Sequence, residues 1–77
     1  HREQQLSVTI LPDASMTEVM SALRTLVPSL VVTRIAQLGA GGYRVIARIR
    51  LPREFDVVDV LERVRTLRGI DNVEITQ

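Results

Sequence analysis

The stretch from Leu30 to Leu51, LVVTRIAQLGAGGYRVIARIRL, decides the fold of this chain. Two runs rich in β-branched residues flank the only dense glycine cluster of the sequence, Gly39-Ala40-Gly41-Gly42. Extended runs joined by a short glycine-rich loop are typical of a β-hairpin. The glycine spacing fits neither nucleotide-binding signature, and a strand rather than a helix follows it. We therefore interpret the cluster as a turn and not as a phosphate-binding loop.

The register of this hairpin determines which side of the sheet each arginine occupies. We favour a three-residue loop over residues 39–41, with Gly41 in the left-handed conformation. On the core face this loop pairs Ile35 with Val45, Thr33 with Ala47 and Val31 with Ile49. The opposite face then carries Val32, Arg34, Arg44, Ile46, Arg48 and Arg50. A four-residue loop would instead turn Arg34 to the core face and Ile35 outward.

A strand and a helix are expected before the hairpin. The strand is indicated by alternating apolar and polar residues, with an inward face of Leu6, Val8 and Ile10. Ser15 is followed by Glu18 at the capping-box spacing, so a helix should begin there. Its apolar residues recur every three or four positions, and Pro28 ends the helix at or before Val27.

A second helix and a last strand are expected after the hairpin. Asp56 suits the N-cap, and the apolar stripe of the helix is Val57, Val60, Leu61, Val64 and Leu67. Phe55 can pack against Val60, and Glu62 can pair with Arg65 one turn later. Gly69 is a typical helix stop, and a strand with inward Val73 and Ile75 follows it.

This order of elements predicts an α+β, ferredoxin-like βαββαβ fold, a four-stranded antiparallel sheet with two helices on one face. The 77 residues, 45 % of them apolar, are enough for one small core. We expect a single domain over residues 6–77, which the resemblance described below makes ACT-like, preceded by a frayed segment or linker end over residues 1–5. Because the chain begins with His1 rather than Met, we expect it to be excised from a larger protein.

Composition excludes several kinds of site. The chain has no cysteine, and its single histidine is His1, so we expect no metal and no cofactor. All ten basic residues are arginine, yet the net charge is only +1, and one Phe and one Tyr cannot supply a base-stacking surface. We expect no nucleic-acid partner. No apolar run is long enough to span a bilayer.

Catalysis has no support in the sequence. No base is apparent for the Ser15 hydroxyl, so a nucleophilic mechanism has no second member. The acylphosphatase version of the fold needs an arginine in the loop after the first strand, and residues 11–13 are Leu-Pro-Asp. The prediction is therefore that the domain is not an enzyme.

The outer face of the hairpin is the predicted interaction surface. Val32 and Ile46 lie among four arginines there, and Leu11 of the first strand is expected to point the same way. Apolar residues rimmed by arginine are typical of a protein interface. A protein partner, or a second copy of the chain in a dimer, is expected on this face.

The chain resembles the ACT domains, and most closely the ACT-like C-terminal domain of the MgtC/SapB family. The resemblance rests on residues 19–26, VMSALRTL, and on residues 60–73, VLERVRTLRGIDNV. It implies a non-catalytic regulatory domain on the cytoplasmic face of the bacterial inner membrane, attached to a parent membrane domain. That family is associated with magnesium limitation and survival inside host cells. Nothing in the sequence itself predicts magnesium binding.

The same resemblance leaves an alternative open, an amino-acid-sensing ACT domain of a metabolic or nucleotide-signalling enzyme. The ligand would approach the loop that holds Asp13 and Ser15. Amino-acid-binding members usually have a glycine in this loop, and residues 11–16 contain none. The Cβ atom and the charge of Asp13 would crowd and repel a ligand carboxylate.

Overall fold

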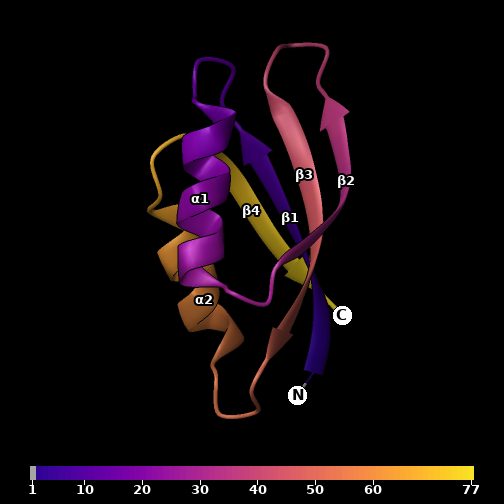
Figure 1. The fold of residues 1–77 in the computed structure, drawn as a ribbon, viewed down its shortest axis with the longest axis vertical. Coiled ribbons are helices and arrows are strands. Elements are labelled where there is room, and N and C mark those ends of the chain that lie inside the picture. Colours follow the sequence, from indigo (N-terminus) through magenta and orange to yellow (C-terminus); the bar gives the residue numbers. More distant parts are fainter. Residues whose placement is uncertain (1) are drawn as a thin grey trace.

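A computed structural model describes residues 2–77; the expectation of a frayed His1 lies outside the described residues. Four strands and two helices follow one another in the predicted βαββαβ order (Figure 1): β1 (Arg2–Ile10), α1 (Met16–Leu26), β2 (Val31–Gln37), β3 (Tyr43–Leu51), α2 (Val57–Arg65) and β4 (Ile70–Thr76). The strands form one antiparallel sheet in the order β2-β3-β1-β4. Both helices lie on the same face of it (Figure 1). The predicted ferredoxin-like α+β fold is confirmed.

β1 begins earlier than the alternation of its sequence indicates. Residues 2–5, expected to be frayed or a linker end, belong to β1 and pair with β3, with Glu3 opposite Arg50 and Gln4 opposite Ile49. The reason is that β3 is nine residues long and offers ladder partners over its whole length. Gln4 is consequently buried in the core, and its Oε1 atom has no hydrogen-bond partner among the described residues.

Both helices begin at the predicted caps. The side chain of Ser15 accepts a hydrogen bond from the backbone N–H of Glu18 at 3.3 Å, and Asp56 accepts one from Val58 at 3.0 Å. Each bond satisfies an N–H group that has no partner inside its helix. The predicted pair of Glu62 and Arg65 is present, with 2.7 Å between Oε2 and Nη2.

The hairpin loop has the predicted three residues. The backbone N–H of Leu38 donates to the carbonyl oxygen of Gly42 at 3.1 Å, which leaves residues 39–41 as the loop. Gly41 has φ +96°, in the left-handed region that a residue with a Cβ adopts only at a cost. Next to the loop the predicted register holds, since Ile35 lies opposite Val45.

Farther from the loop the predicted register is wrong by one residue. A β-bulge lies between Val32 and Arg34, so Val32 pairs with Ala47 and Val31 pairs with Arg48. Thr33 is the extra residue, and its Oγ1 atom donates to the carbonyl oxygen of Ile46 at 3.1 Å. Val32 therefore faces the helices rather than the outside, and Val31 takes the outer position.

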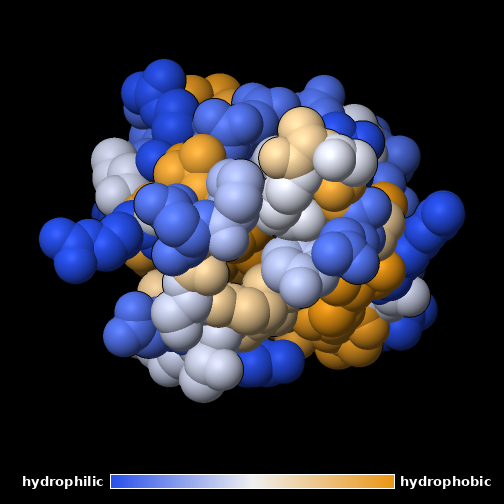
Figure 2. Space-filling view, turned by 90° about the horizontal axis from the view of Figure 1, so that it is seen from above, coloured by the Kyte–Doolittle hydropathy of each residue, from blue (hydrophilic) through white to orange (hydrophobic). Residues whose placement is uncertain are grey.

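The core lies between the helices and the inner face of the sheet. Its buried residues come from every element except β2: Leu6, Val8, Ile10, Val19, Met20, Leu23, Val27, Leu30, Val45, Ala47, Ile49, Leu51, Val60, Val64 and Val73. Ile35 faces this side, as predicted, yet it is 53 % exposed. β2 is an edge strand, and the helices do not reach over its loop end (Figure 1). Figure 2 shows a hydrophobic patch on the right of the molecule, the side of the β2–β3 hairpin in Figure 1.

Candidate functional site

The outer face of the sheet is covered by neither helix (Figure 1). On β2 and β3 it carries the predicted residues Arg34, Arg44, Ile46, Arg48 and Arg50, to which Val31 is added by the bulge. All four arginines are exposed, and Ile46 is half-buried between them. One predicted member is absent from this face, because Val32 points to the helices. Leu11 follows the last residue of β1, and its N–H donates to the carbonyl oxygen of Gly69 at 2.9 Å.

Charge is divided between the two halves of this face. The arginines lie on β2 and β3, whereas β1 and β4 contribute the carboxylates of Glu3 and Glu74. Neutral polar residues fill the remaining outer positions of β1 and β4: Gln5, Ser7, Thr9, Asn72 and Thr76. The one ion pair on this face joins Arg50 Nε to Glu3 Oε2 at 3.8 Å within the described residues, so the other three arginines are free to meet a partner.

The predicted ligand loop lies at the start of α1, whose N-cap is Ser15. A pocket of about 400 Å³ opens there, lined by Asp13, Ala14, Ser15, Glu18, Val19, Ala22 and Arg68. The Ser15 hydroxyl accepts the N–H of Glu18, so it serves as a helix cap. Arg68 gives the pocket one cation opposite two carboxylates, a distribution that suits a zwitterion better than an anion.

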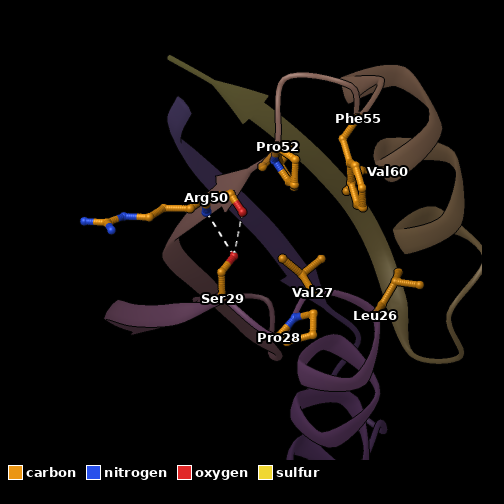
Figure 3. A pocket seen from close by; sticks show the side chains of 9 residues that line it. Leu26, Val27, Pro28, Ser29, Arg50, Pro52, Phe55 and Val60 are labelled. Atoms are coloured by element: carbon orange, nitrogen blue, oxygen red, sulfur yellow. Dashed lines mark hydrogen bonds between the residues drawn. The ribbon is translucent and has the colours of Figure 1, made fainter. Parts of the chain in front are cut away.

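A further pocket of about 410 Å³ lies where the end of α1 meets the end of β3 and the start of α2 (Figure 3). It is lined by Leu26, Val27, Pro28, Ser29, Arg50, Leu51, Pro52, Phe55 and Val60. Sequence reasoning missed this site. The sequence signal for it is Phe55, an aromatic residue that lines the pocket together with Pro28, after α1, and Pro52, after β3. The Phe55 side chain is 51 % exposed.

Ser29 connects this pocket to the edge of the sheet. Its hydroxyl accepts the N–H of Arg50 at 3.0 Å and donates to the carbonyl oxygen of the same residue at 2.9 Å (Figure 3). β2 begins only at Val31, so the serine side chain satisfies the two main-chain groups of Arg50 that a longer β2 would have bonded.

Two other kinds of site are absent from residues 2–77. No group of three His, Cys, Asp or Glu side chains is placed to hold a metal ion in this part of the chain. Neither described helix has the length and apolar character needed to cross a membrane.

Comparison with known proteins supports the fold alone. No protein-family model matches the chain, and no curated protein matches it either. Among solved structures, it is similar to a formyltetrahydrofolate deformylase from Pseudomonas putida KT2440, with a TM-score of 0.62 and 16 % sequence identity. The match covers 99 % of this chain and 29 % of the deformylase chain, so this chain spans less than a third of that enzyme's length. In the deformylase, the part similar to this chain is one section of a longer protein.

Proposed function

We propose that this is a non-catalytic regulatory domain that works by pairing the outer face of its sheet with the same face of a second copy. The observation that carries the proposal is an uncovered sheet face on which three arginines, none of them in an ion pair with a described residue, lie around Ile46. A sheet face is normally covered or fully polar, and an aliphatic residue inside an arginine rim is typical of an interface.

The division of charge favours a second copy as the partner. When two such faces meet about a two-fold axis parallel to the strands, β2 and β3 of one copy lie over β4 and β1 of the other. The arginine half of each copy then faces Glu3 and Glu74 of its partner. Such an interface is self-complementary, as a two-fold symmetric dimer requires.

Ile46→Glu is the sharpest test, because it puts a carboxylate at the centre of the proposed interface. We expect this change to weaken self-association at least tenfold in sedimentation equilibrium, since it removes the central apolar contact and its carboxylate competes with Glu3 and Glu74 of the second copy for the arginines. The matched control is Val58→Glu, which places the same charge on an exposed valine of α2. A wild-type domain that stays monomeric at millimolar concentration contradicts pairing between copies. Binding of the parent protein that Ile46→Glu abolishes would then assign the face to that partner.

The finer proposal is that the domain belongs to an inner-membrane protein of the MgtC/SapB type and lies on its cytoplasmic face. What supports it is the resemblance of residues 19–26 and 60–73 to the end of those proteins. Sequencing the gene upstream of the codon for His1 tests it. Several membrane-spanning segments upstream are expected, and a catalytic domain there would favour the alternative below.

The alternative is an amino-acid-sensing ACT domain, and the observation that favours it is the pocket beside Asp13 and Ser15. Arg68 can hold a carboxylate while Asp13 or Glu18 holds an ammonium group. Titration of ¹⁵N-labelled domain with the twenty amino acids decides the matter. Saturable shifts of the amides of residues 13–18 support this function, and their absence with every amino acid excludes it.

A further inference from the structure

We propose that the pocket between α1, β3 and α2 binds a small amphipathic carboxylate, with its apolar body inside the pocket and its carboxylate on Arg48 and Arg50. The site shares Val31, Arg48 and Arg50 with the outer face of the sheet and is distinct from the pocket beside Ser15. The inference goes beyond the proposed function and does not rest on it, because a single copy of the domain has both hollows.

The pocket itself suits an apolar body. Seven of its nine lining residues are apolar, and its volume of about 410 Å³ falls in the range of small-molecule sites. In Figure 3 the side chains of Leu26, Phe55 and Val60 face those of Val27 and Pro52 across the cavity. Their apolar character favours an acyl chain or an aromatic ring over a hydrated group.

A second hollow adjoins this pocket on the outer side of β3. It has a volume of about 260 Å³ and is lined by Glu3, Ser29, Val31, Arg48 and Arg50. Ser29 and Arg50 line both hollows. The main chain of Arg50 borders the apolar pocket while its guanidinium group extends away from it (Figure 3). An apolar cavity and a cationic one therefore meet at a shared pair of residues.

The junction lies where the Ser29 side chain, rather than a strand, borders β3. β2 starts at Val31, and the chain between α1 and β2 crosses the edge of β3 with only the Ser29 hydroxyl bonded to it. No strand thus separates the helix side from the outer side at Arg50. A ligand can lie across this edge with one end in each hollow.

The charges at the edge select a singly charged anion. Arg48 and Arg50 alternate along β3 and point to the same side, and guanidinium forks bind carboxylates in a bidentate manner. Arg48 forms no salt bridge with any described residue, and Arg50 is engaged only by Glu3 at 3.8 Å. Because Glu3 lines the same hollow, a doubly charged phosphate is opposed more strongly than a carboxylate. An alkyl or aryl monocarboxylate fits all of these features.

The test uses three probes with the same chain length: decanoate, decanol and decyltrimethylammonium. Each is titrated into ¹⁵N-labelled domain below the concentration at which it forms micelles. Decanoate is expected to give saturable shifts of the amides of residues 26–29, 48–52, 55 and 60. Decanol should bind about fivefold more weakly and the cation more weakly still, because both lack the arginine contact. Equal affinity for all three probes, or shifts confined to other residues, overturns the proposal.

Two variants with matched controls separate the halves of the site. Arg48→Gln should weaken decanoate about fivefold and leave decanol unchanged, whereas Arg44→Gln, an arginine of the same strand and face, should alter neither. Phe55→Ala should weaken both probes about tenfold, since it removes an apolar wall, whereas Val58→Ala should have no effect. All four side chains are exposed, so the variants should fold, which the midpoints of thermal unfolding verify. Unchanged decanoate binding in both Arg48→Gln and Phe55→Ala contradicts the assignment.

The outcome is separable from that of the proposed pairing between copies. Ile46→Ala should leave decanoate binding to the dilute domain intact, because Ile46 lines neither hollow and alanine adds no charge beside Arg48. Phe55→Ala should leave self-association intact, because Phe55 is not on the outer face of the sheet. Either proposal can therefore fail alone.

Discussion

The two faces of β3 differ completely although they alternate along one strand. On the helix side, Val45, Ala47, Ile49 and Leu51 are at most 5 % exposed. On the outer side, Arg44, Arg48 and Arg50 are exposed, and Ile46 is half-buried. The core is built from the first set, and the second set contributes little buried surface to it. Burial therefore determines which face of this strand turns to the helices and leaves the outer residues available for a partner.

Truncation on each side of β3 gives the largest expected contrast. Ile49→Ala removes a fully buried side chain and leaves a cavity, so it should lower the free energy of unfolding by about 3 kcal/mol. Arg48→Ala, its neighbour on the other face, should change it by no more than about 0.5 kcal/mol. Urea denaturation followed by circular dichroism measures both. Comparable losses would mean that the outer face also supports the fold.

A pair of valines on β2 gives the next contrast, because the bulge places them on opposite faces. Val32→Glu puts a carboxylate beside the core and should cost about 1–2 kcal/mol. Val31→Glu adds the same charge on the outer face, where the valine is 52 % exposed, and should cost no more than about 0.5 kcal/mol. Urea titrations of the two variants decide the register. If Val31→Glu were the less stable variant, the result would indicate a hairpin without the bulge, in which Val31 faces the core.

Gln4 is the polar exception on the buried face of the sheet. It is 4 % exposed, and no described residue forms a hydrogen bond with its Oε1 atom, so the desolvation of this atom is not compensated by those residues. Replacement by leucine, of similar volume, should raise the free energy of unfolding by about 1 kcal/mol. Gln5→Leu, on the opposite face, should give no such gain. A destabilised Gln4→Leu protein would show that the amide is bonded in solution.

The smallest effect is expected on the solvent side of α2. Glu62→Gln breaks the pair with Arg65, and exposed pairs one turn apart contribute about 0.3 kcal/mol. Thermal unfolding at low and high salt measures the difference, which should vanish in 1 M NaCl because the charges are screened. A difference that persists at high salt would point to a contact other than the ion pair.

Much of the fold follows from local sequence signals. Ser15, Asp56 and Pro28 mark where the helices begin and end, and the glycine cluster marks the loop. These signals act over a few residues, so they need no knowledge of the tertiary structure. The extra length of β1 was missed because nothing in residues 2–5 alternates; only the long partner strand β3 draws them into the sheet.

The candidate site was predictable only where alternation holds. The outer positions of Arg34, Arg44 and Ile46 follow from the length of the hairpin loop. The exchange of Val31 and Val32 depends on a bulge, and no glycine or proline in the sequence indicates that bulge. The pocket beside Phe55 was invisible because its walls come from three elements far apart in the sequence. Sequence periodicity predicts single helices and strands, but it does not predict a pocket that forms between them.

The bulge at Thr33 has a consequence for how related sequences should be aligned. If Thr33 were deleted, Val32 would still pair with Ala47, and the next residue, Arg34, would still pair with Ile46. The two strands would then pair without a bulge, and all remaining side chains would keep their present faces. The hairpin can therefore gain or lose one residue at this position without exchanging its core and its surface. Homologous chains that differ by one residue between the first helix and the glycine loop should carry their gap here, and an alignment that puts it elsewhere would equate buried positions with exposed ones.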